Sequence, residues 1–249
     1  LTMKLSKILA PLLALCLFAS TACASTFIDA HGNEIQLDDS LEAYAAVTLV
    51  GANDAARQSE TNLGDLWTDA LRWFAVSGEI NAAFDEDDVK AGNDHIAVDA
   101  DHVVALWNGG NLRADIAEGT FGAEALAEVL PFPNKVAVVY MSGAQLLEAL
   151  EAASQALPYT AETADACASL MQVSGLTYTV DTAKAYDALE AYGDHWFTAG
   201  SVSRVSISDV NGQPFDETAT YAVVTSNANF NGMDSSYVFK TAAEENELS

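Results

Sequence analysis

The order of hydrophobic and polar residues predicts a helix near the start of the chain and a second one near its middle. Between Asn62 and Ser77 the apolar residues recur every three or four positions, which is typical of one face of an amphipathic helix. Asn62 is expected to cap this helix, and Gly78 to end it. A capping-box pattern at Ser142–Gln145 predicts the second helix, directly after a strand of β-branched residues at 135–141.

Other segments have the pattern of strands. Residues 102–107 are almost continuously apolar, and residues 171–178 and 221–225 are predicted as further strands. Residues 202–209 alternate between apolar and polar, and the Asn211–Gly212 pair that follows is a strong signal for a tight hairpin. Helices and strands are therefore mixed, with hairpins at the end, and this indicates an α+β fold.

The first 24 residues resemble an export signal. Lys4 and Lys7 precede an apolar run at 8–19, which is too short to span a membrane, and Ala22–Ala24 fits a cleavage site. Cys23 also fits a bacterial lipoprotein box, so a lipid anchor at Cys23 is an alternative to simple cleavage. We therefore expect an exported bacterial protein, either periplasmic or lipid-anchored at the cell envelope.

The remainder is divided by its composition into three parts. Residues 25–45 form a short lead-in with a turn at His31–Asn33, residues 46–240 form one domain, and residues 241–249 form an acidic tail. Residues 85–101 are acidic and polar, and they are predicted to form a solvated loop.

Charge and cysteine content exclude several classes of function. The net charge of −26 argues against nucleic acid as a partner, because phosphate backbones need a basic surface. Only Cys167 lies clearly inside the domain, so no intrachain disulfide and no cysteine metal site are expected. The four histidines also lack the spacing of a metal or nucleophile site; they are His31, His95, His102 and His195. No cofactor is expected in this chain.

The segment from Val103 to Asn134 contains the clearest candidate chemistry. A glycine turn follows Asn108, and because glycine carries no Cβ, we expect the backbone to approach a ligand closely there. The Asn108 amide suits the edge of a nucleobase, although it could instead only hold the turn. Arg113 offers a planar fork for phosphate or hydroxyl oxygens. Phe132 lies between two prolines and could stack on a base or simply fill the core.

These motifs resemble the substrate-binding C-terminal domain of the 5′-nucleotidase family, from about Arg57 to Phe239. The matching segments are Glu60–Leu66 (E-x-N-[LM]-G-[ND]-L), Asn108–Arg113 (N-G-G-x-[IL]-R), Leu130–Asn134 (L-P-F-x-N), the strand–[TS]-G–helix unit at 135–153, Gln172–Tyr178 (Q-V-S-G-[LI]-x-[YF]) and Asn227–Tyr237 (N-F-x-x-x-G-G-D-G-[FY]). The resemblance implies an α/β/β/α layered sandwich that binds a nucleoside or nucleotide.

The resemblance also implies the residues that touch the ligand. Asn108, Arg113 and Phe132 match family positions, Asp234 matches the acid that contacts the sugar, and Arg57 matches a site arginine more loosely.

The last segment departs from the family pattern. Ala228 stands where a second stacking phenylalanine belongs, and Phe230, two positions later, is a candidate replacement. Met233 and Ser235 stand in place of two glycines.

Catalysis in this family belongs to a separate N-terminal metallophosphoesterase domain with two metal ions. Because the chain shows none of the D-x-H, G-N-H-[DE] or G-H-x-H motifs of that domain, no catalytic residue and no metal ligand are expected here. Divalent metals are expected only in a separately encoded partner, with which this chain would serve nucleotide catabolism. The alternatives are a non-enzymatic binding or scaffold module at the cell surface or in the periplasm, and an enzyme with an unrecognised site.

Overall fold

A computed structural model describes residues 25–28, 34–37, 43–83, 95–193 and 195–246. The helices are α1 (Asn53–Ala56), α2 (Asn62–Val76), α3 (Glu79–Ala82), α5 (Ala123–Val129), α6 (Gly143–Ala153), α7 (Asn227–Phe230) and α8 (Tyr237–Glu245), with 3₁₀ turns η1 (Gly109–Asn111) and η2 (Ala166–Ser169). The strands are β1 (Ser25–Ile28), β2 (Glu34–Leu37), β3 (Ala43–Ala45), β4 (Val103–Asn108), β5 (Gly119–Phe121), β6 (Val136–Ser142), β7 (Met171–Ser174), β8 (Leu176–Val180), β9 (Ala188–Tyr192), β10 (Trp196–Ala199), β11 (Val205–Val210), β12 (Gln213–Pro214) and β13 (Thr220–Ser226).

The largest sheet has four strands in the order β6-β13-β4-β7. The strands β13 and β4 run parallel to each other, whereas β6 is antiparallel to β13 and β7 is antiparallel to β4. The register places Val136 opposite Ser226 and Met171 opposite Asn108. The carboxyl ends of β4 and β13 therefore meet the starts of β6 and β7 at one edge of the sheet.

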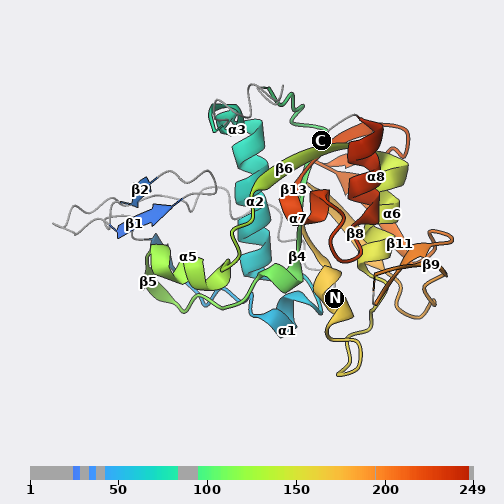
Figure 1. Ribbon diagram of the computed structural model, residues 1–249, viewed down its shortest axis with the longest axis horizontal. Coiled ribbons are helices and arrows are strands. Elements are labelled where there is room, and N and C mark those ends of the chain that lie inside the picture. Colours follow the sequence, from blue (N-terminus) through green and yellow to red (C-terminus); the bar gives the residue numbers. More distant parts are fainter. Residues whose placement is uncertain (1–24, 29–33, 38–42, 84–94, 194, 247–249) are drawn as a thin grey trace.

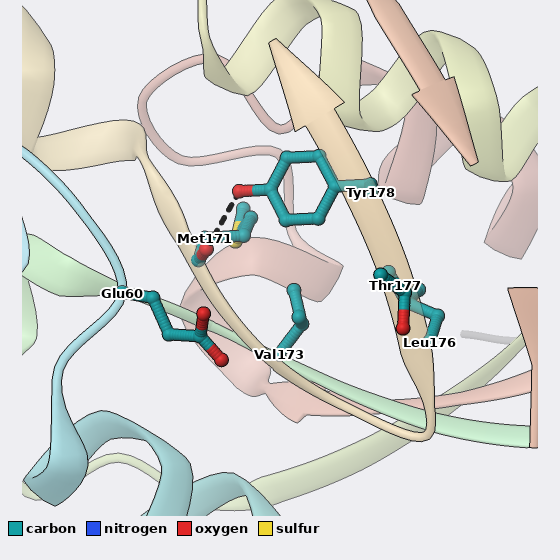
Figure 2. Close-up of a pocket in the computed structure, with 6 residues that line it drawn as sticks. All are labelled: Glu60, Met171, Val173, Leu176, Thr177 and Tyr178. Atoms are coloured by element: carbon teal, nitrogen blue, oxygen red, sulfur yellow. Dashed lines mark hydrogen bonds between the residues drawn. The ribbon is translucent and has the colours of Figure 1, made fainter. Parts of the chain in front are cut away.

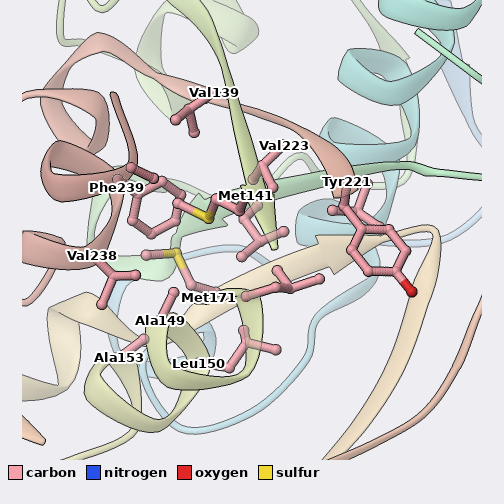
Figure 3. Packing of buried hydrophobic residues seen from close by; sticks show 14 of the residues in the cluster. Val139, Met141, Ala149, Leu150, Ala153, Met171, Tyr221, Val223, Val238 and Phe239 are labelled. Atoms are coloured by element: carbon pink, nitrogen blue, oxygen red, sulfur yellow. The ribbon is translucent and has the colours of Figure 1, made fainter. Parts of the chain in front are cut away.

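Helices cover both faces of this sheet, with α2 on one side and α6 and α8 on the other (Figure 1). Leu71 and Ala75 of α2 pack against alternate residues of β4, including Trp107. The other face packs against α6 and α8 in a cluster that includes Met141 and Phe239 (Figure 3). Because β4 is covered on both faces, all six of its residues are buried, which explains the continuous apolar run in the sequence.

A second sheet of three strands, β12-β11-β8, also contributes to the cluster around α6. The predicted hairpin is confirmed: Asn211 and Gly212 link β11 and β12 with φ angles of 51° and 78°. The prediction of a single strand at 171–178 is wrong, because Gly175, with φ of 84°, divides it. β7 joins the four-stranded sheet and β8 joins the three-stranded one. The observed arrangement is a mixed α+β domain, as the sequence predicts.

The helix starts agree with the sequence at one position and differ at another. The capping box at Ser142 and Gln145 is confirmed. The cap of α2, however, is Thr61, whose hydroxyl accepts a hydrogen bond from the Gly64 N–H at 3.1 Å. Asn62 instead joins α2 to the preceding loop, where its Oδ1 accepts from the Val50 N–H at 2.6 Å.

The boundaries also differ at the carboxyl end. Residues 241–245, assigned to the acidic tail from the sequence, belong to α8, where Ala242 and Ala243 are buried in the core. The antiparallel strands β1 and β2 flank the turn predicted at His31–Asn33. That turn, the export signal at 1–24 and most of the acidic loop (84–94) lie outside the described residues.

Candidate functional site

Four segments that carry the sequence motifs converge at the edge where β4 and β13 end. The Asn227 N–H donates to the Lys135 carbonyl, and the Lys135 N–H donates to Asn227 Oδ1, both at 2.9 Å, which joins the segment after β13 to the one before β6. The Arg113 N–H donates to the Val129 carbonyl at 2.9 Å, and the Gly109 N–H donates to the Leu170 carbonyl at 2.7 Å. Ligands commonly bind at such an edge, where parallel strands end.

Arg113 and Phe132 lie together in this group. The guanidinium carbon of Arg113 lies 5.0 Å from the centre of the Phe132 ring, which is within the range of a cation–π interaction. Phe132 is 42% exposed, so its ring does not fill the core. The pair presents a positive charge beside an accessible aromatic surface.

Asn108 is held by the protein itself. The residue is only 4% exposed, its Oδ1 accepts from Asn111 Nδ2 at 2.7 Å, and its Nδ2 donates to the Ala168 carbonyl at 3.4 Å. This geometry supports the alternative in which Asn108 holds the turn, and contact with a nucleobase stays a prediction.

The glycines after Asn108 allow the chain to pack closely on itself. A Cβ at Gly109 would collide with the Ala56 carbonyl of α1, and one at Gly110 would approach the Ala168 Cβ to 2.6 Å. The sequence suggested a close approach to a ligand here, but the structure shows a close approach of α1 and η2.

Arg57 and Asp234, two further predicted site residues, lie near each other. Arg57 Nη1 donates to the Ala164 carbonyl at 2.7 Å and lies 3.7 Å from Asp165 Oδ1. Burial raises the pKa of the Asp234 carboxyl above its ordinary 3.8, and the charge of Arg57 acts in the opposite direction. The two predicted residues are therefore close enough to interact, and the Arg57 side chain, at 13% exposed, is largely enclosed.

The backbone at Asp234 is unusual. Its φ angle of 55° lies in the left-handed region, which few residues other than glycine adopt, and Gly232 before it has φ of 79°. Backbone hydrogen bonds hold this turn, from the Gly232 N–H to the Asn229 carbonyl at 2.9 Å and from the Met233 N–H to the Ala228 carbonyl at 3.0 Å.

The aromatic wall expected opposite Phe132 is reduced. Ala228 is only 9% exposed and offers a methyl group, while Phe230 packs against the margin of the core cluster around α6 and α8. Met233 is 58% exposed in the same loop. A stacking role for Phe230 stays a prediction.

A small cavity lies between the start of α2 and the β7–β8 turn (Figure 2). Its volume is about 100 Å³, below the roughly 300–1,000 Å³ of typical ligand sites, so it is too small for a nucleoside. Glu60 lines this cavity and interacts with the nearby Asp65. Burial, followed by the charge of Glu60, raises the pKa of Asp65 from 3.8 to about 8.

Metal-binding and membrane-spanning features are absent from the described ranges. In those ranges, no group of three or more His, Cys, Asp or Glu side chains is arranged to hold a metal ion. Among the helices that the structure describes, none combines the length and the apolar character needed to cross a bilayer.

Sequence reasoning missed two residues that touch the site loops, Tyr192 and Trp196 of the β9–β10 hairpin. No motif marks them. Their only signal is that two large aromatic residues flank a short polar segment containing Gly193.

The fold and the converging loops define an α+β domain with a candidate ligand site at one edge of its main sheet. Residues 41–243 match the family described as 5′-nucleotidase, C-terminal domain, and the chain belongs to this family. This confirms the resemblance noted from the motifs.

Two curated relatives and one solved structure illustrate the relationship. The chain is 26% identical over 226 residues to the Trifunctional nucleotide phosphoesterase protein YfkN of Bacillus subtilis, covering 89% of this chain and 13% of that protein. It is 32% identical over 199 residues to the Cell wall protein Lmo0130 of Listeria monocytogenes, covering 76% of this chain and 20% of that protein. It is similar to the crystal structure of a 5′-nucleotidase precursor from Thermus thermophilus, with 32% identity and a TM-score of 0.57 over 80% of this chain and 32% of that chain. The chain spans a fifth or less of the curated relatives and about a third of the solved structure.

Proposed function

We propose that this chain binds a nucleoside or nucleotide at the edge where β4 and β13 end. The observation that carries the proposal is the pairing of Arg113 with the exposed ring of Phe132, and the interaction of Arg57 with Asp234 supports it. In a chain with a net charge of −26, a phosphate needs a particular cation to offset the general repulsion, and Arg113, beside the exposed ring, supplies it.

Each residue has a role in the proposed complex. The guanidinium of Arg113 donates to phosphate oxygens, and one face of Phe132 stacks on the base. The Asp234 carboxylate accepts hydrogen bonds from the ribose hydroxyls, and the charge of Arg57 favours the ionised form of that carboxylate. Asn108 fixes the turn that leads to Arg113.

Hydrolysis is assigned to a partner. We propose that a metallophosphoesterase domain, carried by a separate chain, supplies the divalent metals and the activated water, while this chain presents the substrate. No cofactor is assigned to the present chain. The relative named as a nucleotide phosphoesterase supports nucleotides as the substrate class. The partner proposal fails if a purified pair hydrolyses AMP no faster than the phosphoesterase alone.

The proposed location is the cell envelope. The export pattern at 1–24, with Cys23 as a candidate lipid attachment site, supports it, and one relative is named as a cell wall protein.

Calorimetric titration with AMP, adenosine and uridine tests the binding proposal. We expect saturable binding, with AMP affinity about 10-fold to 100-fold lower in Arg113→Ala, because a hydrogen bond to a charged group is lost. The adenosine affinity is expected to fall less. Lys184→Ala is the matched control, since it removes a cation from the loop between β8 and β9. Absence of binding at millimolar ligand overturns the proposal.

A scaffold module is the second candidate, favoured by Ala228 and the exposed Met233 in the segment where the family has aromatic and glycine residues. Under this alternative the chain binds a protein and no nucleotide. Failure of AMP and adenosine to compete for a demonstrated protein partner favours it.

A further inference from the structure

The β9–β10 hairpin is a separate two-stranded sheet, and its strand β10 contacts α6. Tyr192, the last residue of β9, pairs with Trp196, the first residue of β10. The hairpin is anchored along β10 at two positions. The Phe197 N–H donates at 2.9 Å to Oε1 of Gln155, which follows α6, and the Ala199 N–H donates at 2.9 Å to the Tyr237 hydroxyl of α8. These two bonds hold β10 against the rest of the domain.

Tyr192 contacts the loop that carries Asp234. Its hydroxyl donates to the Gly232 carbonyl at 2.7 Å, and its ring lies 5.7 Å from the ring of Tyr237. The contact is so close that a Cβ at Gly232 would collide with the Tyr192 hydroxyl. Gly232 adopts its positive φ readily, whereas positive φ is less common at a residue such as Asp234, and the Tyr192 hydroxyl adds a contact to the backbone hydrogen bonds that hold this turn.

Trp196 contacts the loop that holds Arg57. Its Nε1 lies 3.4 Å from the Ala166 carbonyl, to which it donates. Ala164 and Asp165, directly before Ala166, are residues that contact Arg57. One end of the hairpin therefore touches both loops that determine where Arg57 and Asp234 lie.

We propose that the β9–β10 hairpin sets the relative position of Arg57 and Asp234, with Tyr192 as the positioning residue. This inference rests on the proposed function, in which Asp234 accepts hydrogen bonds from the ligand. Without the Tyr192 hydroxyl, the 231–234 turn gains freedom, and binding must then order the turn as well as the ligand.

Tyr192→Phe tests the proposal, because it removes one hydroxyl and keeps the ring against Tyr237. We expect the adenosine affinity to fall about threefold to tenfold, the effect of one lost hydrogen bond. Tyr186→Phe is the matched control: it removes a hydroxyl that donates to the Phe197 carbonyl of the same hairpin, at 2.7 Å, and not to the 231–234 turn. Its adenosine affinity is expected to stay within about twofold of the unchanged protein.

A double-mutant cycle separates positioning from general stability. In an Asp234→Asn background, Tyr192→Phe is expected to cause no further loss of adenosine affinity, because its effect acts through Asp234. Amide hydrogen exchange at 231–234 is expected to be faster in Tyr192→Phe and unchanged in Tyr186→Phe.

The outcomes distinguish the two proposals. If the unchanged protein binds adenosine and Tyr192→Phe binds it equally well, or if the two losses simply add, the positioning role is overturned and the proposed function stands. If the unchanged protein binds no nucleoside, the proposed function fails, and so does the proposed effect of Tyr192 on ligand binding. Amide hydrogen exchange at 231–234 in Tyr192→Phe then still reports whether the hairpin holds the turn. If the exchange rates are the same as in the unchanged protein, the proposed support of the turn by Tyr192 is overturned as well.

Discussion

The guanidinium carbon of Arg113 lies 5.0 Å from the centre of the Phe132 ring, so a cation and an aromatic side chain from two distinct motifs form one unit. The arginine follows β4 and the phenylalanine precedes β6, and these strands are separated in the sheet by β13. A substitution at either residue is therefore expected to affect the position of the other. Ligands that contact only Arg113 or only Phe132 can separate the contributions of the two residues to binding.

Phe132→Leu is expected to weaken AMP binding about tenfold or more, because stacking on an aromatic ring contributes roughly 1–3 kcal/mol per base. Ribose 5-phosphate, which has no base, is the control ligand and is expected to bind with little change. Parallel calorimetric titrations measure both. Equal losses for the two ligands would mean that the ring acts by holding Arg113 and not by stacking.

Asp234→Asn is expected to remove a pH dependence from adenosine binding. Burial raises the pKa of Asp234, so the ionised carboxylate that accepts ribose hydrogen bonds is present above that pKa and lost as the pH falls through it. In the unchanged protein the loss of affinity should begin at a higher pH than for an ordinary carboxyl of pKa 3.8. Titrations at a series of pH values check this, and a pH-independent affinity in the unchanged protein contradicts it.

Asp65→Asn is expected to stabilise the fold at alkaline pH. The pKa of Asp65 is raised to about 8, mainly by burial and then by Glu60, so the folded state holds a proton that the unfolded state releases near pH 4. The contribution of the protonated Asp65 carboxyl to the free energy of unfolding is therefore complete below about pH 4, and it decreases as the pH rises toward 8.

Urea unfolding at pH values near 5 and near 8.5, on the two sides of the raised pKa, tests the Asp65 prediction. The urea concentration at the midpoint of unfolding should be higher for Asp65→Asn than for the unchanged protein, mainly at the higher pH. Glu79→Gln, which removes an exposed carboxylate from the first turn of α3, controls for a general loss of negative charge. The same gain at both pH values would show that ionisation of Asp65 is not the cause.

Asn108→Ala is expected to destabilise the fold by about 1–3 kcal/mol, because it leaves the buried partners of the amide without a hydrogen bond. Asn111→Ala removes the same 2.7 Å hydrogen bond, but Asn111 is less buried than Asn108, so a smaller loss of stability is expected. Chemical denaturation measures both. If Asn108→Ala leaves stability unchanged while nucleoside binding is lost, Asn108 contacts the ligand directly.

Sequence patterns predicted the helices and turns that are determined by residues close together in the chain. The apolar spacing from Asn62 gives α2, the Ser142–Gln145 pair gives its capping box, and Asn211–Gly212 gives the hairpin turn. The predicted cap of α2 was one residue late, because Asn62 is engaged by Val50 from an earlier loop. The division at Gly175 was also missed, because that division depends on which sheet each half joins.

The candidate site was predictable only in part, because some of its contacts join segments that are distant in the sequence. Arg113 and Phe132 stand in recognisable motifs, and the structure brings them together. The burial of Asn108 depends on η2, and the contact of Tyr192 with Gly232 joins segments with no shared motif. Such long-range contacts leave no local signal in a single sequence.

The parallel pairing of β4 with β13 also has a consequence for how the protein folds. Residues Ala222 and Val103 pair although a large part of the domain separates them along the chain, so this contact closes a very long loop and is expected to form slowly. Because the proposed ligand residues lie near both ends of that loop, ligand binding should appear only when the last strand has docked. During synthesis, the proposed site would remain incomplete until β13 had emerged and docked, and a fragment ending before β13 would retain Arg113 and Phe132 but lack Asp234.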